Sequence, residues 1–384
     1  MARLLILTAA ELTRDPRARR AATAAVAAGL DVVGVCQASG GAPVGLPGVA
    51  IVRTNGGSLS TRLRSAGLGG GRRDHAILRE ARGVFRLLRL ARLTVALTRG
   101  ARRTGAVEIV HANDFDTLLA GWLIAGRRGR LVYDAHEIYT EQEVDPPRFQ
   151  RAVVAGLERM LVRRAADVVT VNEPIAAELT RRLRLPHPAP VVGNVPETVH
   201  IDEVERSAQL RVVYQGALGH GRQLDDLVRA AELTGEEIRF SLRVVGQPTD
   251  ELRRFVAGRA DVLEPVDPDM LVAALAPFDV GVVVTRPLTL NDELATPNKL
   301  FEYLMAGLAV AAPRLPGVAS IIERDGVGVT FSPGDPADLA RALRDLAADR
   351  TRLEEIRRRA RQVAVEKYNA SAERPALAAA WGIA

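Results

Sequence analysis

The chain has 384 residues, of which 47% are hydrophobic and 26% charged, and its formal net charge is +6. This length and composition are ordinary for a soluble globular protein with two domains, each with its own core. The single cysteine, Cys36, excludes a disulfide within the chain, and no stretch reaches the roughly 20 apolar residues that a membrane span requires. We therefore expect a cytoplasmic protein whose basic surface meets an anionic partner.

In the first half of the chain, short apolar runs alternate with helical patterns. The runs are RLLILT (3–8), DVVGVC (31–36), VEIVH (107–111), RLVYD (130–134) and DVVTV (167–171), and none of them alternates with polar residues. Strands that are buried on both faces of a parallel sheet have this composition. Between them we predict helices at 16–28, 116–125 and 173–183, of which the first two end at a glycine. The pattern predicts a doubly wound α/β domain.

The segment from Arg62 to Arg103 carries twelve arginines and only two acidic residues. Leucines and arginines recur in it at helical spacing, which predicts a basic amphipathic helix. The simpler interpretation is a surface helix that packs on its domain, and the alternative is peripheral contact with the inner face of an anionic membrane. Nucleic-acid binding is disfavoured because no aromatic stacking platform accompanies the arginines.

A proline-rich break at 183–200 separates this half from a second series of apolar runs. Strand candidates follow at 210–216, 239–246, 261–266, 279–284, 308–313 and 327–331, with helical patterns between them. We predict an N-terminal domain over 1–195, a linker over 196–208, a C-terminal domain over 209–366 and a tail over 367–384. Whether the tail crosses back to the first domain is left open. In such sheets ligands bind at the carboxyl ends of the strands, so the expected site is a central cleft between the domains.

The stretch ATPNKLFEYLMAG (295–307) contains Lys299, one of only two lysines in the chain. Thr296 can cap a helix here, and Pro297 suits its first position. The helix N-terminus and Lys299 would form an anion site, and Glu302, one turn further on, can accept both hydroxyls of a ribose. The alternative is an exposed ion pair between Lys299 and Glu302 that contributes roughly a few tenths of a kcal/mol.

This stretch resembles the donor-site motif of the GT-B glycosyltransferases, in particular the retaining glycosyltransferase family 4. The resemblance implies two Rossmann-like domains that face a central cleft, with a nucleotide-diphosphate sugar held by the C-terminal domain. It assigns donor binding to Asn298, Lys299, Leu300 and Glu302. Many members carry a further glutamate eight positions earlier, where this chain has Leu294; Asn291 and Glu293 are candidates in its place.

A second stretch, VVYQGALGHGRQLDDLV (212–228), resembles the phosphate-binding loop of the same family. Gly216 ends an apolar strand and a glycine-bearing loop follows. In the family, an arginine follows the first glycine and a lysine comes five positions later. These positions hold Ala217 and Arg222 here, so one basic ligand is absent and the other is an arginine, which can bind phosphate in a bidentate manner. The alternative for Arg222 is an ordinary solvated side chain.

The N-terminal half resembles the family's acceptor-binding domain through TRDPRARR (13–20), VEIVHANDFDT (107–117) and GRLVYDAHE (129–137). The resemblance implies acceptor contacts for Asp15, Arg17 and His111, and catalytic roles for Asp114, His136 and Glu137. The position of His136 lies near the transferred sugar in the family, and a pKa close to neutrality would let it donate a hydrogen bond or carry a proton. A histidine that only caps a strand end is the alternative for both histidines, and for His111 it is favoured.

We thus predict a hexosyltransferase-type enzyme that moves a sugar from a UDP-sugar, or second a GDP-sugar, to an acceptor hydroxyl. Retention of configuration is implied by the family alone. No cofactor or metal is expected, because the helix end, Lys299 and Arg222 can stabilise the departing diphosphate. The pairs Asp114–Asp116 and Asp267–Asp269 are interpreted as helix caps and not as metal ligands. The rival functions are a nucleotide-sugar epimerase on the same fold and a non-catalytic basic scaffold on membranes.

Overall fold

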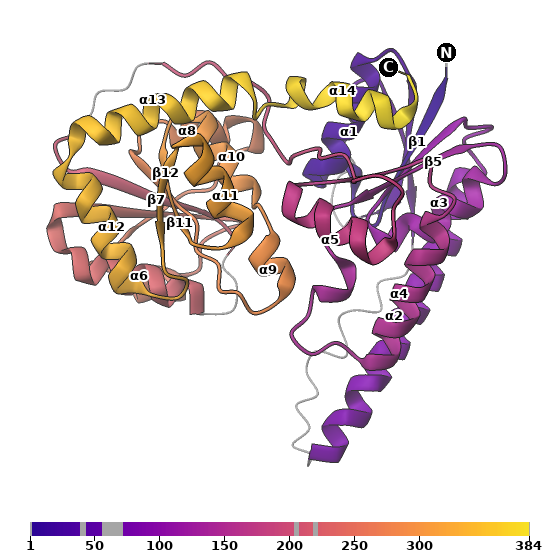
Figure 1. Ribbon diagram of the computed structural model, residues 1–384, viewed down its shortest axis with the longest axis horizontal. Coiled ribbons are helices and arrows are strands. Elements are labelled where there is room, and N and C mark those ends of the chain that lie inside the picture. The colour runs from indigo at the N-terminus through magenta and orange to yellow at the C-terminus, as the bar shows by residue number, and fades with distance from the viewer. Residues whose placement is uncertain (1, 39–43, 56–71, 203–206, 218–221, 384) are drawn as a thin grey trace. The chain divides into compact units, whose positions relative to one another are not determined.

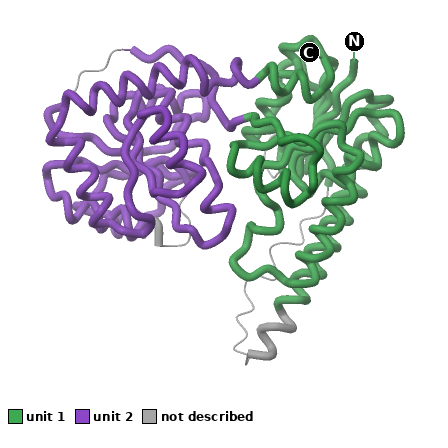
Figure 2. Tube along the Cα trace, in the orientation of Figure 1, with its two compact units in different colours: residues 1–192, 374–384 green, residues 193–373 purple. Residues whose placement is uncertain are grey.

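A computed structural model describes residues 2–38, 44–55, 72–202, 207–217 and 222–383, without the side chains of 72–78 and 222–223 (Figure 1). The chain forms two compact units (Figure 2). Unit 1 comprises residues 1–192 and 374–384, and unit 2 comprises residues 193–373. The first boundary thus lies three residues before the predicted end of the N-terminal domain, and the last part of the tail belongs to unit 1.

Unit 1 is built on a parallel six-stranded sheet in the order β3-β2-β1-β4-β5-β6. Its strands are β1 (Arg3–Thr8), β2 (Asp31–Gln37), β3 (Val49–Thr54), β4 (Ile109–Asn113), β5 (Arg130–Ala135) and β6 (Asp167–Thr170). Its helices are α1 (Pro16–Ala27), α2 (Arg72–Ala101), α3 (Phe115–Ala125), α4 (Arg148–Val162) and α5 (Glu173–Leu183), with short 3-10 turns η1 (Leu12–Arg14) and η2 (Tyr139–Glu141). The strand order reverses between β1 and β4, which is where doubly wound sheets bind ligands.

The C-terminal helix α14 (Ala370–Trp381) completes the core of unit 1. Its last turns carry Leu377, Ala380 and Trp381, which are buried against the apolar cluster that includes Leu4 and Ile6 of β1. Burial of the large indole of Trp381 stabilises the packing of these last residues on unit 1.

Unit 2 repeats the same arrangement in the order β12-β11-β10-β7-β8-β9. Its strands are β7 (Leu210–Gly216), β8 (Ile238–Val244), β9 (Asp261–Leu263), β10 (Val280–Val282), β11 (Ala309–Pro313) and β12 (Gly328–Phe331). Its helices are α6 (Arg222–Thr234), α7 (Asp250–Val256), α8 (Leu271–Leu275), α9 (Leu290–Leu294), α10 (Asn298–Met305), α11 (Pro316–Asp325), α12 (Pro336–Ala348) and α13 (Arg350–Glu366), with 3-10 turns η3 (Gly235–Glu237) and η4 (Pro268–Met270). The predicted class of two doubly wound parallel-sheet domains is confirmed.

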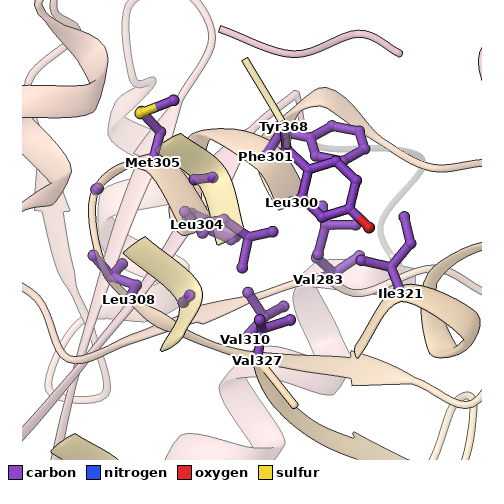
Figure 3. Close-up of a cluster of buried hydrophobic side chains, with 14 of the residues drawn as sticks. Val283, Leu300, Phe301, Leu304, Met305, Leu308, Val310, Ile321, Val327 and Tyr368 are labelled. Carbon is purple, nitrogen blue, oxygen red and sulfur yellow. The ribbon is translucent and has the colours of Figure 1, made fainter. Parts of the chain in front are cut away.

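Both faces of the unit 2 sheet carry an apolar core, because successive residues of a strand point to opposite faces. Val213 of β7 joins the cluster on the α10 side, whereas its neighbours Val212 and Tyr214 join the cluster on the α6 and α12 side. On the α10 side, Leu300, Phe301, Leu304 and Met305 surround Leu308, Val310, Ile321 and Val327 (Figure 3). Apolar residues on one stripe of α10 therefore fix which face of the helix remains available for a ligand.

Tyr303 attaches α10 to the two strands between which the order reverses in unit 2. Its hydroxyl accepts a hydrogen bond from the backbone N–H of Gln215 in β7 (2.8 Å) and donates one to the carbonyl of Val282 in β10 (3.3 Å). The ring lies directly on Gly281, where an added Cβ would lie 2.3 Å from Cγ of Tyr303. The N-terminus of α10 is thereby held against the end of β7.

Candidate functional site

In unit 2, the ammonium group of Lys299 lies at the carboxyl end of β7. Gly216 ends that strand with φ of +135°, and a Cβ there would lie 2.8 Å from Nζ of Lys299. The same Nζ lies 4.0 Å from the ring centroid of Tyr214. Because Lys299 also belongs to the first turn of α10, one place combines a lysine, a helix N-terminus and a glycine without a side chain. This combination is suited to a phosphate group.

The charge of Lys299 is poorly solvated before any ligand arrives. Burial lowers the pKa of Lys299 to about 8, and the charge of Glu302 opposes this decrease. Lys299 and Glu302 are both half-buried, which differs from the exposed ion pair of the alternative interpretation. A half-buried ammonium gains more from an anionic ligand than a solvated one, because its water has already been removed.

In unit 1, Asp114 and His136 meet at the carboxyl ends of β4 and β5. Oδ2 of Asp114 lies 2.9 Å from Nδ1 of His136, and Oδ1 accepts a hydrogen bond from the backbone N–H of His136 (3.1 Å). Asp114 adopts φ of +60° and ψ of 167°, a conformation that costs of order 1–3 kcal/mol in a non-glycine residue. Such strain is concentrated at functional sites, so the pair marks a candidate reaction centre.

Two sequence families match the chain, one in each half. The family described as Glycosyltransferase Family 4 matches residues 17–195, and the one described as Glycosyl transferases group 1 matches residues 209–349. The chain belongs to the group 1 and family 4 glycosyltransferases. As such it is a transferase of glycosyl groups, as the motif of Lys299 and Glu302 predicted.

Two structural relatives of this glycosyltransferase have its fold across nearly their whole length. Sucrose-phosphate synthase from Thermosynechococcus elongatus is 16% identical with a TM-score of 0.74, covering 99% of this chain and 98% of that one. Anabaena HepE in complex with UDP and glucose is 14% identical with a TM-score of 0.67, and 99% of each chain is covered. The GT-B assignment of the fold is therefore confirmed.

A curated relative is the sulfoquinovosyl transferase of Arabidopsis thaliana, which is 30% identical over 162 residues. The match covers 41% of this glycosyltransferase and 30% of the relative. The chain thus spans less than a third of that protein's length.

His136 of this glycosyltransferase is a charged group at neutral pH. Burial alone would lower its pKa, but the charge of Asp114, the hydrogen bond to Asp114 and the nearby carboxylate of Asp134 raise the pKa to about 10. The expectation of a proton carrier with a pKa near neutrality is therefore wrong. An imidazolium in this position can donate hydrogen bonds and stabilise nearby negative charge, but it cannot accept a proton as a base at pH 7.

We expect NMR titration to place the midpoint of His136 near pH 10, and to lower it by at least one unit in Asp114→Asn. The signals of His187, which is exposed, should not change between the two proteins. Because the folded pKa exceeds the ordinary 6.5, the stabilisation is complete below pH 6.5 and is lost as the pH rises through about 10. A midpoint near 6.5 in the wild type would contradict the ion pair.

Arg17 and His111, which were predicted to bind the acceptor, are instead buried around Asp134 of β5. The guanidinium of Arg17 donates to both carboxylate oxygens of Asp134 at 2.6–3.0 Å and to the carbonyl of Val192. Nε2 of His111 lies 3.2 Å from Asp134, and its Nδ1 accepts a hydrogen bond from the indole of Trp381 (3.2 Å). Both side chains are at most 5% exposed, so the acceptor roles are wrong and the groups organise the fold.

Leu300 is a core residue and not a donor ligand. Its side chain is completely buried in the cluster of Figure 3, and its N–H donates to the carbonyl of Pro297 (3.0 Å). The predicted cap is also wrong, because α10 is preceded directly by Pro297 and the hydroxyl of Thr296 donates to the carbonyl of Gly317 (3.3 Å). Asn298 occupies the first position of α10 and is half-buried, so its contact with the donor stays a prediction.

Three other predicted residues keep untested roles. Asp15 caps α1, since its Oδ1 accepts from the N–H groups of Arg17 and Ala18 (both 3.1 Å) and its Oδ2 from the hydroxyl of Thr8 (2.7 Å). Glu137 is half-buried and accepts a hydrogen bond from the amide of Gln142. The side chain of Arg222, which begins α6, lies outside the described residues.

The two Asp-x-Asp pairs open helices as predicted, since Asp114 and Asp267 occupy the N-cap positions of α3 and η4. Neither side chain, however, forms a capping hydrogen bond with the helix that follows it. Asp114 pairs with His136, and Asp116 accepts a hydrogen bond from the hydroxyl of Tyr139 (2.7 Å). Among the described residues, no three His, Cys, Asp or Glu side chains are grouped so that they would hold a metal ion.

Within the arginine-rich segment, residues 72–101 form the long helix α2, as predicted, and residues 62–71 lie outside the described residues. Leu90, Leu93 and Leu97 are buried on the face that packs against α3 and α4. The opposite face exposes Val84, Leu88 and Val95, which are 46–58% accessible, beside the exposed arginines Arg82, Arg92 and Arg99. No helix in the described ranges is both long and apolar enough to cross a bilayer. Contact of this face with a membrane surface stays a prediction.

Proposed function

We propose that the chain transfers a sugar from a UDP-sugar, or second a GDP-sugar, to an acceptor hydroxyl, with retention and without a metal. The observation that carries the proposal is the ammonium of Lys299 beside Gly216 at the N-terminus of α10. UDP is favoured because the Anabaena relative with the same fold was solved with UDP and glucose. Retention is supported only by membership of the family.

Departure of the nucleotide diphosphate builds negative charge on its terminal phosphate. The ammonium of Lys299 and the first N–H groups of α10, which have no acceptor inside the helix, would stabilise that charge. Other transferases stabilise this charge with a metal ion. We propose metal independence because the ammonium of Lys299 and the N–H groups of α10 can stabilise it instead. The leaving phosphate can then accept the proton of the acceptor hydroxyl.

Glu302→Ala is expected to remove nucleotide recognition. At about one hundred times its dissociation constant, UDP should stabilise the wild type by roughly 2.7 kcal/mol, a rise of a few degrees or less in Tm. The rise should disappear in Glu302→Ala, and UDP should bind the wild type at least tenfold better than 2′-deoxy-UDP, because Glu302 would accept the ribose hydroxyls. The panel also contains GDP, dTDP, ADP and NAD.

The matched control is Glu355→Ala, because Glu355 is exposed on α13 of the same unit. It should keep the full thermal shift. The absence of a shift with every nucleotide would favour the non-catalytic scaffold. Conversion of a UDP-sugar into its epimer without an acceptor would favour the epimerase.

For the outer face of α2 we propose contact with anionic lipid, since apolar side chains and arginines lie together there. Leu88→Ser combined with Val95→Ser should lower sedimentation with vesicles of phosphatidylglycerol and phosphatidylcholine by roughly tenfold. Met160→Ser is the control, because Met160 is 53% exposed on the neighbouring helix α4. Undiminished sedimentation of the wild type with vesicles of phosphatidylcholine alone would contradict an electrostatic contact.

A further inference from the structure

Unit 1 contains a cavity of about 760 Å³ at the carboxyl edge of its sheet. Ala9, Gln37 and Asn55, at the ends of β1, β2 and β3, line one side of it, and residues of α2, α4 and η2 line the others. The volume lies within the range of roughly 300–1,000 Å³ that is typical of small-molecule sites. Asp116 lies in its wall, two residues beyond Asp114 in the sequence.

The cavity has an apolar floor and a rim of groups that pair with hydroxyls. Leu90, Leu93 and Val154 are buried beneath it. The amide side chains of Gln37, Asn55, Gln142 and Gln150 line the rim, and each can both donate and accept. Oε1 of Gln150 is buried and forms no hydrogen bond within the described part of the chain. A buried acceptor left unpaired is unfavourable, and a ligand hydroxyl would satisfy it.

Three arginines line the cavity, and two of them are neutralised. Arg86 forms an ion pair with Glu143, and Arg151 forms one with Glu141. Arg89 forms no ion pair with the residues that the structure describes, although its charge acts on Asp116 and Tyr139, where it opposes the increase in pKa that burial causes. A guanidinium is always charged in proteins, so Arg89, which is exposed at this cavity, is available to pair with an anionic ligand.

We infer that this cavity is the acceptor site, and that the acceptor is a compact polyol with one anionic group, such as a sugar or cyclitol phosphate. The anionic group lies on Arg89, the hydroxyls pair with Gln150 and the other amides, and a hydroxyl donates to Asp116. An apolar aglycone would leave the buried Oε1 of Gln150 without a hydrogen-bond partner. The inference rests on the proposed function and specifies its acceptor. The polyol phosphate is either free or the headgroup of a lipid.

Calorimetric binding in the presence of saturating UDP tests the inference. The probes are glucose 6-phosphate with glucose, inositol 1-phosphate with inositol, and short-chain phosphatidylinositol. At least one phosphorylated polyol should bind tenfold or more tightly than its neutral parent. Arg89→Gln should reduce that ratio to near one, whereas Arg92→Gln, an exposed arginine on the same helix outside this cavity, should preserve it. Tighter binding of phosphatidylinositol than of inositol 1-phosphate would identify the lipid as the source, and the reverse would identify the free phosphate.

Three results would overturn the inference. The wild type could bind phosphorylated and neutral probes equally, or bind no phosphorylated probe at all. Arg89→Gln could also keep the wild-type ratio of affinity for the phosphorylated polyol to affinity for its neutral parent. UDP binding to each protein is measured separately. Failure of the wild type to bind any nucleotide would refute the proposed donor site without changing the probe ratios. Normal UDP binding in Arg89→Gln, together with a lost ratio, would show that only the acceptor site had been altered.

Discussion

Lys299→Met is expected to weaken UDP binding by roughly tenfold to hundredfold while the fold survives. The side chain places its charge beside Gly216, where a phosphate would lie, and methionine keeps its length without the charge. Because burial has already lowered the pKa of Lys299 to about 8, removal of the cation should leave the free energy of unfolding unchanged or higher. Calorimetry with UDP and urea unfolding measure the two quantities.

The same lysine should make UDP binding depend on pH. The fraction of protonated Lys299 falls as the pH rises through about 8, so the affinity should decrease above pH 8. The terminal phosphate of UDP, with a pKa of about 6, is already ionised there and adds no dependence. The stability of the unliganded fold depends on pH in the opposite direction. Between pH 8 and 10.5 the lysine binds more protons in the unfolded chain than in the folded one, so its contribution to the free energy of unfolding rises with pH.

Lys299→Arg keeps its charge at these pH values, so its affinity for UDP should be flat above pH 8 even if the larger head group binds less well. Lys367→Met, at the only other lysine of the chain, is the control and should bind UDP like the wild type. An affinity of the wild type that stays constant from pH 7 to 9, or full binding by Lys299→Met, would contradict a phosphate-binding role of this side chain.

The strands of both sheets could be predicted mainly because a parallel sheet with helices on both faces needs continuous apolar runs. β7 and β11 have that composition and were recognised. β3 was missed because Val49–Thr54 is mostly half-exposed and Arg53 interrupts the apolar pattern, whereas the other edge strands β6, β9 and β12 overlap predicted runs. Local composition thus identifies a strand more reliably where its apolar run is uninterrupted.

The sequence could also predict that Gly216 and Lys299 belong to one place, because strand ends share an edge of the sheet. It could not predict which polar side chains turn inward. Arg17 and His111 look like ligands in the sequence, and only Asp134 explains why they are buried. A signal was present, since an aspartate in the apolar run RLVYD requires a buried cation. Tyr303 gave no such signal, because its role depends on Gly281, a residue 22 positions earlier.

Asp134→Asn is expected to destabilise unit 1 by about 3–5 kcal/mol. Asp134 is 1% exposed and is the partner of Arg17, which is 5% exposed, and of His111, which is completely buried. An asparagine keeps the shape but removes the charge, so Arg17 becomes a buried cation without compensation. Both tryptophans of the chain, Trp122 and Trp381, belong to unit 1, so their fluorescence during urea unfolding reports this unit directly.

Replacement of both partners provides the decisive comparison for Asp134. Asp134→Leu with Arg17→Met removes the charges together and should recover most of the lost stability, because two apolar side chains can fill the volume of a buried ion pair. Burial raises the pKa of Asp134, but Arg17 and the two histidines hold it well below its ordinary value of 3.8. The stabilisation is therefore complete above pH 3.8 and should be lost only as the pH falls through the lower folded value. A loss below about 1 kcal/mol in Asp134→Asn would show that Arg17 finds another partner, and the double variant would then be the less stable of the two.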